Sequence, residues 1–145
     1  MSRNKIVSIH EYTFYNNVKL VWLDLGRNSI NYKHPSTFAN VRSLTELHIS
    51  DNKINSIAPE TFTVNVELQW LSLNDNTITD IHPSTFQTNS KLAGLHMSGN
   101  KFATIKPGTY DNNGLIWKET AYLMSIRQHF EITGGFVIWI YQETK

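Results

Sequence analysis

An asparagine recurs every 24 residues along most of this chain, and no other feature restricts the fold as strongly. The asparagine column consists of Asn4, Asn28, Asn52, Asn76 and Asn100. An aromatic residue preceded by threonine follows on the same period, at Phe14, Phe38, Phe62, Phe86 and Tyr110. A unit this short cannot cover its own apolar face, so the repetition predicts coils that bury their faces by stacking on one another.

Each unit divides into a strand-like half and a turn-like half. The stretch Leu71–Leu73 alternates apolar and polar residues, which is typical of a short strand with one buried face. The other half, residues 78–86, has regularly spaced apolar residues and a proline, which favours turns or a 3₁₀ path over a long helix. The sequence therefore predicts a coil with one parallel strand per turn.

The asparagine and phenylalanine columns have a structural interpretation inside such a coil. A buried amide can bond to unpaired backbone groups of its own loop and of the next loop. Stacked phenyl rings would fill the space beneath the return path of the chain. We therefore expect a hydrogen-bonded ladder and an aromatic stack, formed by Asn28, Asn52, Asn76, Asn100, Phe38, Phe62 and Phe86.

The pattern LxxLxLxxNxIxxIxPxTF, clearest over residues 68–86, resembles the leucine-rich repeat. The resemblance runs from Asn4 to about Tyr110, in the 24-residue form typical of animal extracellular receptors and secreted matrix proteins. It implies an α/β-type solenoid, a horseshoe with a parallel β-sheet on its concave face and turns or 3₁₀ helix on its convex side. It also implies a receptor-like protein that is secreted or lies at the cell surface.

The repeat pattern fades towards the C-terminus, which divides the chain in two. Residues 1–116 are predicted to form the solenoid, with a partial first repeat. Residues 117–145 are interpreted as a C-terminal capping segment or a non-native tail. In the capping interpretation, a helix over Glu119–Ile132 and a buried strand over Phe136–Tyr141 cover the open end. In the second repeat, Lys33 replaces an expected isoleucine, and Tyr32 is the candidate to fill the gap.

Composition excludes several classes of function. The chain has no cysteine, which excludes disulfide caps, thiolate zinc sites and cysteine nucleophiles. Its net charge of +1 gives no general attraction to nucleic acid, and no apolar run is long enough to cross a bilayer. We predict no cofactor, no nucleic-acid partner and no membrane insertion by this chain. The resemblance implies an extracellular or cell-surface location; the absence of an evident secretory signal and of cysteine caps points instead towards an intracellular or incomplete product.

Residues beside the buried leucines of each strand face outward in a leucine-rich repeat, and they supply the candidate binding site. Trp22 and Trp70 are the strongest candidates, because exposed tryptophans are costly to solvate and are enriched at binding hot spots. Glu46 lies between them, and Gly94 is expected to open a notch beside Trp70 for an aromatic or cationic side chain. The predicted ligand-binding residues are Trp22, Asp24, Glu46, His48, Trp70, Ser72 and His96.

The row of Asp24, His48 and Ser72 has the residue types of a hydrolytic triad. A parallel sheet uses its backbone N–H groups in strand pairing, so it offers no oxyanion hole. The alternative is a solvated polar row in which His48 simply bonds Asp24. We predict neither catalysis nor a metal site.

Together these observations predict a non-enzymatic protein–protein interaction module that recognises a protein or peptide on its concave face. The alternative is a truncated structural fragment of a larger leucine-rich repeat receptor, with no independent ligand. Uncapped ends would also allow self-association. The strands present roughly a few hundred Å², below the about 800 Å² per partner of a standard interface, so this chain alone is expected to bind weakly.

Overall fold

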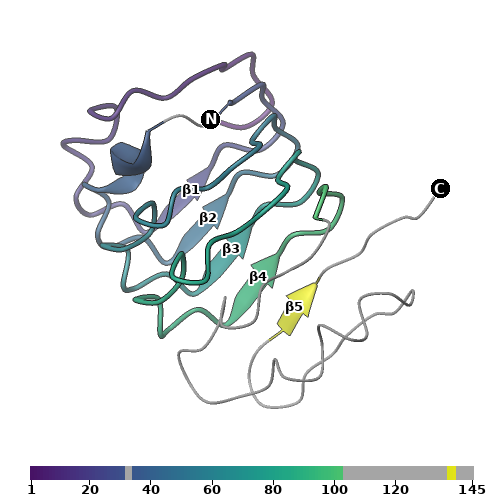
Figure 1. Cartoon of the computed structure of the whole chain (residues 1–145). Coiled ribbons are helices and arrows are strands. Elements are labelled where there is room, and N and C mark those ends of the chain that lie inside the picture. The colour runs from purple at the N-terminus through teal and green to yellow at the C-terminus, as the bar shows by residue number, and fades with distance from the viewer. Residues whose placement is uncertain (32–33, 103–136, 140–145) are drawn as a thin grey trace.

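Five short strands form one parallel sheet in the computed structural model, in the order β1-β2-β3-β4-β5 (Figure 1). The structure describes residues 1–31 and 34–102, and the backbone of residues 137–139. The strands are β1 (Trp22–Asp24), β2 (Glu46–His48), β3 (Trp70–Ser72), β4 (Gly94–His96) and β5 (Val137–Trp139). Because sequential strands are neighbours throughout, each coil packs against the coils before and after it.

The first four strands pair with one buried leucine opposite the next. Leu47 of β2 lies opposite Leu23 on one side and Leu71 on the other. Neighbouring side chains of a strand point to opposite faces, so the central leucine enters the core while its two neighbours face outward. The predicted strand at Leu71–Leu73 lies one residue earlier, at Trp70–Ser72, and Leu73 is a buried residue just beyond its end.

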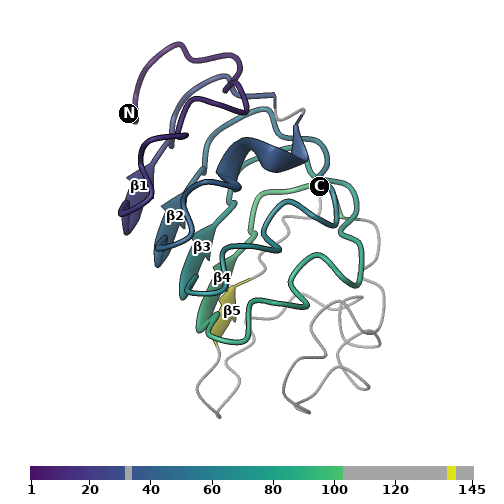
Figure 2. The ribbon, with the colours of Figure 1, turned by 90° about the vertical axis from the view of Figure 1, so that its left-hand side faces the viewer.

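The return half of each coil consists mainly of turns. Among the described residues one 3₁₀ helix is present, η1 (Pro35–Phe38), and its first residue is a proline, which needs no N–H partner at that position. Figure 2 shows the strands along one side of the molecule and the return paths along the other. The turn-rich path predicted from the proline and the spaced apolar residues is therefore present.

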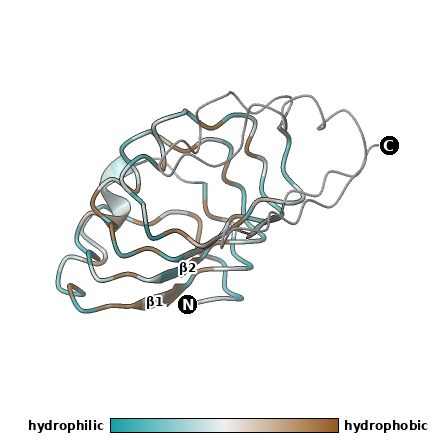
Figure 3. Ribbon diagram, turned by 90° about the horizontal axis from the view of Figure 1, so that it is seen from below, coloured by the Kyte–Doolittle hydropathy of each residue, from teal (hydrophilic) through white to brown (hydrophobic). Residues whose placement is uncertain are grey.

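The core lies between the sheet and the return paths. Hydrophobic and hydrophilic stretches alternate along each coil (Figure 3). Phe38 and Phe62 stack with ring centroids 6.0 Å apart, and Phe62 and Phe86 at 5.8 Å, with interplanar angles below 15°. Phe14 extends the stack at 6.3 Å from Phe38. The phenyl rings thus form a continuous column through successive coils.

The asparagine column links each coil to the one before it. Asn76 Nδ2 donates to the carbonyl oxygens of Ile49, Leu73 and Asn74 at 3.0–3.1 Å, and its Oδ1 accepts from the Ile54 N–H at 3.0 Å. The same set of bonds recurs at Asn28, Asn52 and Asn100. One side chain therefore satisfies backbone groups from two coils, which fixes the register between them.

The C-terminal strand extends the sheet beyond the 24-residue period. β5 pairs in parallel with β4, and Ile138 lies opposite Leu95. It falls within the strand expected over residues 136–141. The expected helix over residues 119–132, the boundary at 116/117, and residues 32 and 33 lie outside the described residues, so the capping role and the domain boundary stay predictions. Within the described part of the chain, no helix is long and apolar enough to span a membrane.

Candidate functional site

The outward-facing residues of β1–β4 form one surface, here called the sheet face. Strand pairing places Trp22 opposite Glu46 and Glu46 opposite Trp70 in one column. It places Asp24, His48, Ser72 and His96 in the second column. The structure thus brings all seven predicted binding residues onto a single surface, because every strand enters the sheet in the same register.

Two tryptophan–histidine pairs with the same geometry lie on the sheet face. The ring centroids of Trp22 and His48 are 6.0 Å apart at an interplanar angle of 51°, and those of Trp70 and His96 are 6.2 Å apart at 52°. In each pair the histidine comes from the next strand. Trp22 remains 53% exposed and Trp70 41% exposed. Each indole therefore packs against an imidazole and keeps part of its surface accessible to solvent.

The notch expected beside Gly94 is wrong, because the indole of Trp70 occupies that space. A Cβ atom added to Gly94 would overlap with Cε3 and Cζ3 of the Trp70 ring. The glycine therefore lets the ring lie down on the backbone of β4. Sequence reasoning identified the neighbouring positions but not the direction of the indole.

The row of Asp24, His48 and Ser72 is bonded differently from the expected His48–Asp24 contact. Asp24 Oδ1 accepts a hydrogen bond from the Gly26 N–H at 2.8 Å, and His48 Nε2 lies 3.5 Å from Glu46 Oε2. The Ser72 hydroxyl lies 2.6 Å from the hydroxyl of Ser50. The expected His48–Asp24 hydrogen bond is therefore wrong. Each of the three side chains instead contacts a nearby residue, either in its own coil or in the coil beside it. The row also lacks the serine–histidine contact of a hydrolytic triad.

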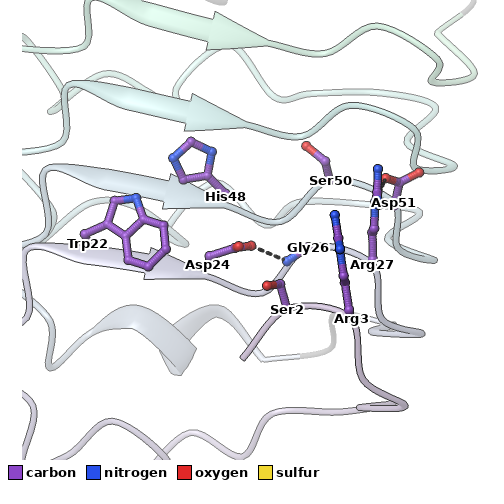
Figure 4. A pocket seen from close by; sticks show the side chains of 9 residues that line it. All are labelled: Ser2, Arg3, Trp22, Asp24, Gly26, Arg27, His48, Ser50 and Asp51. Carbon is purple, nitrogen blue, oxygen red and sulfur yellow. Dashed lines mark hydrogen bonds and ion pairs between the residues drawn. The ribbon is translucent and has the colours of Figure 1, made fainter.

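A pocket of about 520 Å³ opens at the β1 end of the sheet face (Figure 4). Trp22 and His48 border it at one end and Arg3 and Arg27 at the other, with Asp24 between them. The remaining lining residues are Ser2, Gly26, Ser50 and Asp51. The pocket thus combines an aromatic wall, two carboxylates and two guanidinium groups.

The strand residues of the sheet face carry negative charge near neutral pH. Burial raises the pKa of Asp24, but hydrogen bonds from Gly26 and Ser2, and the charges of His48 and the N-terminus, bring it below its usual value. Desolvation, with repulsion from His48, lowers the pKa of His96 and favours its neutral form. None of the lysines or arginines lies in β1–β4, so within these strands the only basic side chains near Asp24 and Glu46 are histidines. Arg3 and Arg27, from the neighbouring loops, border the pocket that Asp24 lines.

A left-handed backbone residue precedes each asparagine of the ladder, a feature that sequence reasoning missed. The φ angles are positive, from 52° to 68°, at Arg3, Arg27, Asp51, Asp75 and Gly99. The sequence carries a sign of this conformation: Asp51, Asp75 and Gly99 occupy this column, and aspartate and glycine tolerate the left-handed region better than most residues. Arg27 Nε lies 3.4 Å from Asp51 Oδ2, an exposed ion pair across neighbouring coils.

Two histidines outside the sheet face, His34 and His82, stabilise turns. The Nδ1 atoms of His34 and His82 accept hydrogen bonds from the Ser36 and Ser84 N–H groups, each at 3.2 Å. Among the described residues, no group of three or more histidine, aspartate and glutamate side chains gathers in a way that could hold a metal ion.

A family model described as "Leucine rich repeat" matches residues 1–54, 42–102 and 66–113. The chain belongs to the leucine-rich repeat family. The buried leucines opposite one another, the asparagine ladder and the phenylalanine stack are the physical form of the leucine-rich repeat pattern in this sequence.

Solved leucine-rich repeat structures share this arrangement. One is described as the octameric complex of Latrophilin 3 (Lec, Olf), Unc5D (Ig, Ig2, TSP1) and FLRT2 (LRR); it is 26% identical over 78% of this chain and 35% of that chain, with a TM-score of 0.70. The APL1 leucine-rich repeat domain is 28% identical over 77% of this chain and 29% of that chain, with a TM-score of 0.72. The Toll–Spatzle complex of Drosophila shares the fold at 21% identity and a TM-score of 0.67, over 94% of this chain and 18% of that one.

No curated protein matches the sequence. This leucine-rich repeat chain spans about a third or less of the length of the solved chains that it matches.

Proposed function

We propose that this leucine-rich repeat chain is a non-enzymatic interaction module that binds a protein or peptide through the sheet face, the concave side of the horseshoe. The observation that carries the proposal is the repeated Trp–His pair, in which two roughly half-exposed indoles each pack against a histidine with the same ring geometry. Tryptophans are enriched at binding hot spots, and two of them in register on one face offer a partner large, rigid contact areas.

A relative supports a partner-binding role. The description of the complex with FLRT2 places a leucine-rich repeat protein in an assembly with Latrophilin 3 and Unc5D. Together with the 24-residue form of the repeat, this favours an extracellular or cell-surface location for the present chain.

The size of the sheet face limits the affinity. Four strands about 4.8 Å apart span roughly 15–20 Å, and each contributes roughly 10 Å of length. This area is well below the about 800 Å² per partner of a standard interface. We therefore expect weak binding by this chain alone and stronger binding where further coils extend the surface.

The proposal is tested by selecting binders from a random peptide library displayed on phage. Recovered clones are then measured against the wild type, the Trp22→Ala/Trp70→Ala variant and a Glu60→Ala variant on the return path, with melting temperatures as the folding control. We expect most clones to lose binding only to the double tryptophan variant. Clones that bind all three proteins equally would contradict a binding role for the sheet face and favour the fragment alternative.

Self-association through the first coil is a second candidate property, supported by its surface. Five of its outward side chains are exposed and apolar or aromatic: Val7, Tyr12, Tyr15, Val18 and Val21. In the second coil the same columns hold the mainly polar residues Asn31, Ser36, Ala39, Arg42 and Thr45. Since the following coils hold mostly polar residues in these columns, with Val66 an exception, the first coil has a surface suited to burial against a second copy.

A further inference from the structure

The two tryptophans of the sheet face have a defined spacing. Trp22 and Trp70 occupy the same column, with Glu46 of β2 directly between them. Each pairing step between parallel strands is about 4.8 Å, so the two indoles are attached about 9.6 Å apart. The spacing is held by backbone pairing and by the asparagine ladder, so it is a rigid property of the surface.

This spacing distinguishes among peptide conformations. A polyproline II helix rises about 3.1 Å per residue with three residues per turn, so every third side chain faces the same way, about 9.3 Å apart. Alternate side chains of an extended strand are only about 6.7 Å apart. Side chains seven residues apart on an α-helix are about 10.5 Å apart, a poorer match.

The charge of the surface indicates the composition of the ligand. Asp24 and Glu46 lie beside and between the tryptophans, and β1–β4 contribute no lysine or arginine. Arg3 and Arg27 border the pocket that Asp24 lines, so Glu46, which does not line that pocket, is the carboxylate that a basic ligand would meet. Glu46 is half-buried, and its polar contact among the described residues is the one with His48 at 3.5 Å. A basic side chain that reaches over the column between the indoles would complement this carboxylate.

Building on the proposed function, we infer that the sheet face binds a proline-rich segment in the polyproline II conformation. The segment crosses β1–β4 and places prolines three residues apart on Trp22 and Trp70. A basic side chain next to one proline lies against Glu46. The ligand class is thus a Pro-x-x-Pro peptide with an adjacent arginine or lysine.

The chemistry of the surface suits this occupant. Proline rings pack on flat aromatic surfaces, and a preformed polyproline II helix loses little entropy on binding. Its carbonyl groups have no internal hydrogen bonds and need donors from the protein. The indole N–H groups of Trp22 and Trp70 and the imidazoles of His48 and His96 are donors on this face.

The test uses synthetic blocked peptides and the full chain. The probe peptide carries two prolines three residues apart and one flanking arginine. Two control peptides have the prolines two or four residues apart, and a third replaces the arginine with alanine. Binding is followed by NMR titration of the indole N–H resonances of ¹⁵N-labelled protein, assigned with single Trp→Phe variants. We expect the probe to shift both the Trp22 and Trp70 resonances, and to bind at least tenfold more tightly than the peptides with altered spacing.

Variants then assign the contacts. Trp22→Ala and Trp70→Ala should each weaken binding of the probe at least tenfold. Glu46→Gln should weaken it about two- to fivefold, the range of an exposed ion pair, and should leave the arginine-free peptide unaffected. Val66→Ala, at an exposed apolar residue outside the strands, should leave binding unchanged.

The inference is overturned if the probe does not bind, if peptides with altered spacing bind equally well, or if only one indole responds. A helical peptide with apolar residues seven apart that binds better than the probe would also overturn it. Phage clones whose binding requires both tryptophans but whose sequences lack the Pro-x-x-Pro spacing would support the proposed function and contradict this inference alone. Clones whose binding is unchanged when both tryptophans are replaced would contradict the proposed function itself.

Discussion

At the scale of single residues, Gly94 and Trp70 act as a pair. Gly94→Ala places a methyl group against the Trp70 ring, which must rotate away from its preferred position. An off-rotamer side chain costs about 0.5–1.5 kcal/mol, so we expect a loss of about 1 kcal/mol in urea unfolding. In a Trp70→Ala background the same substitution should cost almost nothing. An equal cost in both backgrounds would show that the glycine serves the backbone and not the indole.

His96 provides a second prediction at this scale. Desolvation, and secondarily the nearby His48, lowers the pKa of His96 below its usual 6.5. As pH falls, the unfolded chain therefore takes up the proton first. The contribution of His96 to stability is complete above pH 6.5 and is lost as pH falls through the folded-state pKa. NMR titration of the His96 ring should give a pKa below 6.5, and His48→Gln should raise it only in part, because desolvation remains. A pKa at or above 6.5 would contradict the burial of this ring.

At the scale of the repeated element, the asparagine ladder carries a large share of the local stability. Asn76→Ala removes four hydrogen bonds and leaves buried backbone groups of two coils without partners. Each such group costs about 1–3 kcal/mol, so we expect a loss of at least about 2–3 kcal/mol in chemical unfolding. Asn28→Ala, at a half-buried member of the same column, should cost less because water can replace the lost partners. Equal losses at both sites would mean that burial does not set the cost.

The sequence predicts the repeating part of the element well and its side-chain directions poorly. The leucine and asparagine columns identify the strands, the core and the outward-facing residues of the sheet, because period and burial are linked by simple geometry. The direction of the Trp70 indole depends on whether the next strand offers a glycine, and the partner of His48 depends on which carboxylate is nearer. Which of several nearly equivalent contacts a side chain makes depends on the three-dimensional positions of its neighbours, and the spacing of residues in the sequence does not specify those positions.

At the scale of the whole molecule, the apolar first coil predicts self-association. Val18 is 55% exposed on this coil, and Val66 occupies the same column two coils later at 45% exposure. Sedimentation velocity should show a dimer population that grows with concentration and that Val18→Ser reduces, since the substitution removes apolar area from the contact. Val66→Ser is the matched control and should have no effect. A concentration-independent monomer, or equal effects of both substitutions, would contradict an interface on the first coil.

The pairing of β4 with β5 has a practical consequence. These strands pair in register although residues 97–136 separate them, a segment about twice as long as residues 73–93 between β3 and β4. The entropy of closing a connection grows slowly, by about 0.6 kcal/mol for each doubling of its length. A scaffold of this kind can therefore accept grafted sequence between its strands at modest thermodynamic cost. An engineer could lengthen one connection to carry an epitope or a reporter and leave the tryptophan surface unaltered.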